Sequence, residues 1–268
     1  MVSTFLWRDH PINVFGIGDC DDEGTLFSLS TLNITSVGLK KKRNLEIWLT
    51  DFYSTDAQFE EYLSTYWLPE TSPDTIKTLM TYYPSDITQG SPYDTGILNA
   101  LTSQNKRIAS FQGDAVFQAP RRFFLNARSG QQPTWSFCES LWFELCSQHD
   151  LFVCITVNKR LKYLPVLGSV SVASEISRNL SIVDVSFQVH ISDILNVYGD
   201  GEMTDYLVRF VANLDPNGNT GINWPQYTPS SPNLLTFLDW PVPLAITQDT
   251  FRQEAIAYLT NVTLANPI

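Results

Sequence analysis

Residues 12–25 read Ile12-Asn13-Val14-Phe15-Gly16-Ile17-Gly18-Asp19-Cys20-Asp21-Asp22-Glu23-Gly24-Thr25. The apolar first half predicts a short buried strand over residues 12–17, ended by Gly18-Asp19. The second half is an acidic turn, in which Asp19, Asp21 and Asp22 crowd Glu23. Such a turn is typical of a solvated loop, and its spacing does not fit a calcium-binding loop. The residues by themselves therefore leave the role of Glu23 open.

The rest of the chain combines long helical patterns with few apolar runs. Apolar periodicity and capping residues predict helices over residues 56–68, 72–80, 105–126 with a kink at Pro120, 204–214 and 248–259. A second short strand is predicted over residues 163–167, and a Pro-rich loop over residues 225–243. Few strands separated by long helices predict an α/β fold, but two strands are too few for an independent sheet. We therefore expect an incomplete sheet with packing helices.

Composition and charge narrow the class of protein. Apolar residues make up 43% of the chain and charged residues 17%, which is typical of a globular protein. The formal net charge of −11 argues against nucleic acid as a partner, because an acidic chain repels phosphate. No run of eighteen apolar residues occurs, so no transmembrane span is predicted. The four cysteines show no metal-ligand spacing, so we expect no metal site.

The chain contains three histidines, which are the candidates for a general base in acyl transfer. His10 lies near the N-terminus and His149 in a stretch of unusual sequence. His190 follows the second predicted strand, and a loop beyond the carboxyl end of a strand is where α/β enzymes place reacting groups. A single histidine is more often an ordinary hydrogen-bonded residue, so both interpretations of His190 stay open.

Short blocks along most of the chain resemble the type-B carboxylesterases, which include yeast-type lipases and cholinesterases. The block around the acid of the catalytic triad is similar to Gly18-Asp19-Cys20-Asp21-Asp22-Glu23-Gly24-Thr25-Leu26-Phe27. The further matches, in family order, are Tyr83-Pro84, Gln89-Gly90-Ser91-Pro92, Gly113-Asp114, Ala119-Pro120-Arg121-Arg122, Leu164-Pro165-Val166-Leu167-Gly168, His190-Ile191-Ser192-Asp193, Asp215-Pro216-Asn217 and Trp224-Pro225-Gln226-Tyr227. One such block is weak, whereas so many in order indicate the family, and within it the fungal lipases and carotenoid ester lipases.

The resemblance implies that residues 1–268 are the C-terminal portion of a carboxylesterase type-B domain with an α/β-hydrolase fold. Glu23 then matches the triad acid and His190 the general base. In the family these residues activate a serine that attacks the carbonyl of a carboxylic ester, with no metal or organic cofactor. Lipid or carotenoid esters are the implied substrates. Family members are usually secreted, although residues 1–18 lack the apolar core of a secretory signal, and the oligomeric state stays open.

The nucleophile of the family is missing from this sequence. No Gly-x-Ser-x-Gly pentad occurs, and the Gly-rich oxyanion loop is also absent. We therefore expect this chain alone not to hydrolyse esters. Two alternatives stay open. The chain could be a non-catalytic esterase-like binding module, which a full-length chain with a substituted Gly-x-Ser-x-Gly pentad would support. It could also be an inactive gene-model fragment, which an adjacent reading frame carrying the pentad would support.

Three ranges do not match the family: residues 37–58, 138–157 and 170–188. Val170-Ser171 can be encoded by a splice donor and Phe187-Gln188 by an acceptor, and removing residues 170–188 restores the family spacing before His190. Cys138-Glu139-Ser140 and Thr156-Val157 allow a second such pair. For the first range, Val37-Gly38 permits a weaker donor, and the end lies near Ser54 or at Gln58. We interpret the ranges as translated introns, the alternative being surface insertions, which loops tolerate.

This interpretation affects the expected position of His190 and one of three possible glycosylation sites. An insertion directly before His190 would displace the base, and a displacement of about 1 Å can cost roughly a hundredfold in rate. Sequons occur at Asn33, Asn179 and Asn261, and Asn179 falls within residues 170–188. Asn33 and Asn261 are expected glycosylation sites only if the protein is secreted.

Overall fold

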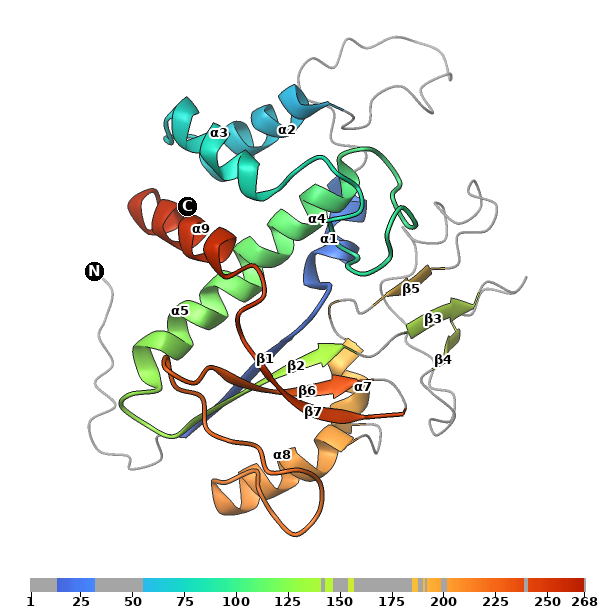
Figure 1. Cartoon of the computed structure of the whole chain (residues 1–268), viewed down its shortest axis with the longest axis vertical. Helices are drawn as coiled ribbons and strands as arrows, with labels where there is room; N and C mark the ends of the chain where they lie inside the picture. Colours follow the sequence, from blue (N-terminus) through green and yellow to red (C-terminus); the bar gives the residue numbers. More distant parts are fainter. Residues whose placement is uncertain are drawn as a thin grey trace.

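The computed structural model describes residues 14–31, 55–140, 143–146, 154–156, 185–187, 190, 192–198, 202–238 and 241–267. A four-stranded sheet in the order β1-β2-β6-β7 lies at its centre (Figure 1). The strands are β1 (Phe15–Cys20), β2 (Thr134–Ser140), β6 (Asn233–Leu238) and β7 (Leu244–Gln248). β1, β2 and β6 are parallel, and β7 is antiparallel to β6. The α/β class expected from the sequence, a sheet with packing helices, is confirmed.

Helices pack on both faces of this sheet (Figure 1). They are α1 (Glu23–Thr31), α2 (Asp56–Tyr62), α3 (Pro73–Tyr82), α4 (Asn105–Gly113), α5 (Ala119–Arg128), α7 (Ser192–Tyr198), α8 (Glu202–Asn213) and α9 (Gln253–Ala265). Consecutive residues of a strand point to opposite faces. Trp135 therefore packs with Tyr206 of α8, whereas the hydroxyl of Ser136 contacts Arg121 of α5 on the other face. None of the helices in the described part of the chain is long and apolar enough to cross a membrane.

Two apolar clusters account for most of the buried hydrophobic side chains. The first joins the sheet to α8 and consists of Trp135, Met203, Tyr206, Trp224, Leu235 and Phe237. The second lies among α2, α3, α4 and α9 and includes Phe59, Leu79, Tyr83, Phe111 and Leu259. Burial of such aromatic side chains is a large favourable contribution to folding. The second cluster fixes α4, which lies beside α1 and therefore beside the acidic turn (Figure 1).

The first strand is shifted from its expected position. β1 begins at Phe15 and continues to Cys20, because parallel pairing with β2 extends through Gly18, Asp19 and Cys20. The glycine at position 18 does not end the strand. A Cβ atom there would overlap the ring of Phe137, so glycine permits the close contact between the two strands. The extension brings the acidic turn to the edge of the sheet where the parallel strands end.

The expected structure near the C-terminus is wrong in two places. Residues 225–243 were expected to be a Pro-rich loop, but they contain β6. The last helix begins at Gln253 rather than Gln248, because Leu244–Gln248 pairs with β6 as β7. The pairing of β6 with the distant β2, and of β7 with the neighbouring β6, therefore overrides the local pattern. The strand expected over residues 163–167 lies outside the described residues.

The helix expected over residues 105–126 is divided. α4 and α5 are joined by a π-helical segment, η2 (Asp114–Gln118), and Pro120 occupies the first turn of α5. Proline lacks the N–H that an uninterrupted helix would use, which accounts for the irregular turn before it. The helices expected over residues 56–68, 72–80 and 204–214 are present, the first continuing from α2 into a second π-helical segment, η1 (Leu63–Trp67).

Two of the ranges that do not match the family contribute to a second, three-stranded sheet. Its strands are β3 (Phe143–Cys146), β4 (Cys154–Thr156) and β5 (Val185–Phe187), in the order β4-β3-β5 and antiparallel. All three strands fall within residues 138–157 and 170–188, and β2 also continues to Ser140 within the first of these ranges. The described parts of the two ranges therefore pair with each other.

The first range that does not match the family, residues 37–58, is described only in its last four residues. Residues 37–54 lie outside the described residues, whereas residues 55–58 take part in the fold. Thr55 and Gln58 form a capping box at the start of α2. Asp56 lies 2.6 Å from Nη1 of the buried Arg107. These contacts associate residues 55–58 with α2 and α4.

Candidate active site

Glu23 lies at the first position of α1, directly after the turn that follows β1. Its Oε1 accepts a hydrogen bond of 2.8 Å from the backbone N–H of Cys20. A Cβ atom at Gly24 would overlap the carbonyl oxygen of Ala109, so glycine at this position lets α1 approach α4 closely. This packing and the hydrogen bond from Cys20 fix the carboxyl group at the end of the sheet.

His190 is brought to Glu23 from a distant part of the chain. Its Nδ1 lies 2.6 Å from Oε2 of Glu23, although the two residues are 167 positions apart. The side chain of Glu23 is 6% exposed and that of His190 is 30% exposed. The rings of Phe27 and Phe117 flank the imidazole, with centroids 5.1 Å and 4.7 Å from it. The acid is therefore buried behind the histidine, which stays accessible to solvent.

The pKa of the Glu23 carboxyl lies above its ordinary value, mainly because the group is buried. Burial raises the pKa of its carboxyl, whereas the N–H of Cys20 and the neighbouring His190 lower it. The negative charge of Asp19 adds to the increase. When the carboxylate accepts the Nδ1 proton of His190, Nε2 is left unprotonated and can accept a proton. This arrangement suits a general base that is oriented by a carboxylate.

Asp22 has different partners, although it is the neighbour of Glu23. Its Oδ1 accepts hydrogen bonds from the hydroxyl of Ser91, at 2.8 Å, and from the backbone N–H of Tyr93, at 2.9 Å. Ser91 also hydrogen-bonds to Thr25, with 2.6 Å between the two oxygens. Burial raises the pKa of Asp22 to about 7, against the lowering effect of Tyr93. Of the two adjacent carboxylates, Glu23 is therefore the one that contacts the histidine.

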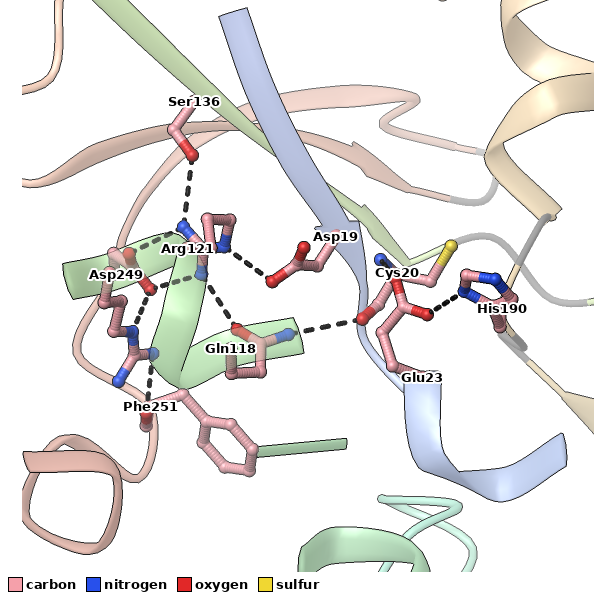
Figure 2. A network of polar contacts seen from close by, with 10 residues as sticks. Asp19, Cys20, Glu23, Gln118, Arg121, Ser136, His190, Asp249 and Phe251 are labelled. Carbon is pink, nitrogen blue, oxygen red and sulfur yellow. Dashed lines mark hydrogen bonds and ion pairs between the residues drawn. The ribbon is translucent and has the colours of Figure 1, made fainter. Parts of the chain in front are cut away.

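A buried ion network lies behind the acidic turn (Figure 2). Nε of Arg121 donates to Asp19 at 2.7 Å, and its two terminal nitrogens donate to the carboxylate of Asp249 at 2.8 and 2.9 Å. Arg122 contacts the same carboxylate at 2.7 Å. Nη2 of Arg121 also donates to Gln118, whose amide nitrogen reaches the carbonyl oxygen of Cys20 at 3.3 Å. The network connects β1, η2, α5 and the segment before α9.

Sequence reasoning found part of this arrangement. It found Glu23 and His190, and the structure places them in contact. Arg121 lies in a block that resembles the family, but no pattern in the sequence marks Asp249 or Gln118 as part of the site. His10 and His149 lie outside the described residues. Among the described residues, no group of three or more His, Cys, Asp or Glu side chains could hold a metal ion.

Comparison with known proteins shows which proteins this chain is similar to. No family model matches the chain. Lipase 4 of Diutina rugosa is 37% identical over 216 residues, which is 80% of this chain and 30% of that protein. Lipase 2 of the same organism is 34% identical over 252 residues, covering 91% of this chain and 35% of that protein. Over most of its length the chain is similar in sequence to these fungal lipases. This relationship is consistent with the α/β-hydrolase fold expected from the sequence.

The chain spans about a third of the length of the curated relatives that it matches. Secreted lipase 1 of Botryotinia fuckeliana is 28% identical over 272 residues, covering 97% of this chain and 36% of that protein. That protein and the secreted triacylglycerol lipase LIP1 of Gibberella zeae are both described as secreted by their names. Among solved structures, a PNB esterase matches with a TM-score of 0.46 and 14% identity, over 90% of this chain and 37% of that chain.

Proposed function

We propose that this chain supplies the acid and the base of a serine carboxylic ester hydrolase, with Glu23 as the acid and His190 as the base. The observation that carries the proposal is the distance of 2.6 Å between Nδ1 of His190 and Oε2 of the buried Glu23. Its homologues are lipases, which supports a lipid ester as substrate. The nucleophilic serine is absent from this sequence, so the proposal places it in a part of the protein beyond residues 1–268.

The mechanism follows from the geometry of the pair. Nε2 of His190 takes the proton of the serine hydroxyl while the serine oxygen attacks the ester carbonyl. The imidazolium then gives that proton to the leaving alcohol, which leaves an acyl-serine. The same nitrogen then deprotonates a water molecule as the water oxygen attacks the acyl-serine carbonyl. The imidazolium returns this proton to the serine oxygen as the acyl–oxygen bond breaks, which releases the carboxylic acid and restores the serine hydroxyl. Glu23 stays ionised, holds the ring orientation and stabilises the imidazolium. No step requires a metal or an organic cofactor.

The test uses the full-length protein that contains the nucleophile, with p-nitrophenyl butyrate as substrate. Glu23→Gln keeps the shape of the side chain but removes the charge, and we expect kcat to fall about 10⁴-fold. His190→Ala should lower it to a similar extent. Asp22→Asn is the matched control, because it neutralises the neighbouring carboxyl, which contacts Ser91 instead of His190. Full activity of Glu23→Gln, or an equal loss in Asp22→Asn, would contradict the assignment.

The ranges that do not match the family have their own test. We propose that residues 138–157 and 170–188, together with a first range from residue 37 to residue 54 or 58, are translated introns. Loss of residues 138–157 and 170–188 would make the sheet β4-β3-β5 absent from the protein encoded by the mature transcript. Sequencing of the mature transcript across this locus and upstream of Met1 decides this. A transcript without the ranges and with an upstream Gly-x-Ser-x-Gly supports both proposals. A transcript that retains the ranges refutes the intron interpretation.

A further inference from the structure

The π-helical segment η2 contacts His190 directly and contacts Cys20, whose N–H donates to Glu23. Phe117 and Gln118 are its last two residues. The ring of Phe117 packs on the imidazole of His190 with 4.7 Å between centroids. The amide nitrogen of Gln118 donates to the carbonyl oxygen of Cys20 at 3.3 Å. A π-helical turn rotates successive side chains differently from an α-helix, and such turns are frequent at functional sites.

Cys20 links Gln118 to the acid through its backbone. Its carbonyl oxygen accepts from Gln118, and its N–H donates to Oε1 of Glu23 at 2.8 Å. The two groups belong to one residue at the end of β1, so a shift of this residue moves the hydrogen bond to the carboxylate. Glu23 uses its other oxygen, Oε2, for His190. The position of Cys20 therefore affects the orientation of the carboxylate toward the base.

Arg121 fixes the orientation of the Gln118 amide. Its Nη2 donates to Oε1 of Gln118 at 2.8 Å, which leaves the amide nitrogen directed to Cys20 (Figure 2). The guanidinium group has five N–H donors. The remaining four are directed to Asp19, to Ser136 and twice to Asp249. The guanidinium is therefore held from several sides and cannot turn without breaking buried ion pairs.

We propose that Gln118, oriented by Arg121, is a positioning residue for the Glu23–His190 pair. It acts through Cys20 and does not touch the reacting atoms. This inference rests on the proposed function, because the pair is catalytic only there. Gln118 is neutral and half-buried, so replacing it leaves no buried charge without a partner. Substitution of Arg121 or Asp249 would do so, and the resulting loss of stability would hide a positioning effect.

The test uses Gln118→Met and Gln118→Glu in the full-length protein. Methionine keeps the length of the side chain and removes both polar groups. Glutamate keeps an acceptor for Arg121 but has no N–H for Cys20. We expect both variants to lower kcat about 10- to 100-fold on p-nitrophenyl butyrate, with KM unchanged, because a small displacement of a catalytic group affects the transition state. Gln131→Met is the matched control, since Gln131 is exposed and contacts Ala127 and Arg128.

Two further measurements separate positioning from a structural role. The strongly downfield proton NMR resonance of Nδ1–H of His190 should weaken or exchange faster in both Gln118 variants, while the thermal midpoint stays that of wild type. Wild-type kcat in both variants, or a loss of kcat that follows a fall in the thermal midpoint, would overturn the inference. If Glu23→Gln stays active, the proposed function itself fails. If Glu23→Gln is inactive while the Gln118 variants are fully active, only the positioning role fails.

Discussion

Asp22→Asn should stabilise the protein at alkaline pH and have little effect in acid. The carboxyl of Asp22 is buried and accepts hydrogen bonds from Ser91 and Tyr93 through Oδ1. Burial raises its pKa from 3.8 to about 7, against the hydrogen bond from Tyr93, and the nearby Asp21 and Asp94 add to the increase. Asparagine keeps an oxygen in the position of Oδ1 and does not ionise. The substitution therefore removes the cost of a buried charge while its main acceptor remains.

The sign of the effect follows from proton binding. Between pH 3.8 and about 7 the folded state holds the Asp22 proton more tightly than the unfolded state does. Its contribution to the free energy of unfolding therefore decreases as pH rises through this window. At about 1.36 kcal/mol per pH unit, the full interval corresponds to about 4 kcal/mol. We expect Asp22→Asn to be more stable than wild type by up to about 4 kcal/mol at pH 8, and by little at pH 4.

Urea unfolding of the full-length protein, followed by tryptophan fluorescence from pH 4 to pH 8, measures this difference. Asp74→Asn is the matched control, because it removes one exposed negative charge from the start of α3. A difference between Asp22→Asn and wild type that does not change with pH would refute the reasoning. So would a variant that is less stable than wild type at pH 8.

Three further changes test other parts of the structure. Burial raises the pKa of Asp249, but Arg121 and Arg122 hold it below its ordinary value. Asp249→Asn should therefore lower the free energy of unfolding in urea by about 3–5 kcal/mol at pH 7. That loss should shrink as pH falls through 3.8 and below, and an undiminished loss in acid would contradict it. Deletion of residues 37–54 should give a higher thermal midpoint than deletion of residues 37–58. The longer deletion also removes the Asp56–Arg107 ion pair and the capping box of α2. Equal midpoints would contradict this expectation. Asn261 is exposed on α9, so protein secreted from a fungal host should lose mass on endoglycosidase treatment, and Asn261→Gln should lack this part of the shift.

Glu23 and His190 were selected because both lie in blocks that resemble the family. The structure places the two side chains in contact, and their catalytic role stays a prediction. The sheet was underestimated because β2 and β7 were not expected and β6 lies in a range expected to be a loop. β2 forms only by pairing with β1 and β6, which are distant in the chain, and β7 then pairs with the neighbouring β6. Gly18 shows the same effect, because it continues β1 only where Phe137 of β2 packs against it.

The residues alone predicted the α/β class, whereas the choice of Glu23 as the acid and His190 as the base came from the resemblance to the family. The acidic turn was expected to be solvated, but Asp19, Asp22 and Glu23 are buried in the folded chain. The contacts between those residues depended on tertiary structure. Asp22 and Glu23 are chemically similar neighbours, and only the folded chain directs one to Ser91 and the other to His190. Gln118, Arg121 and Asp249 likewise meet the acidic turn only after folding. The physical reason is that hydrogen bonds and buried ion pairs depend on distances between side chains, which the fold sets for residues far apart in sequence.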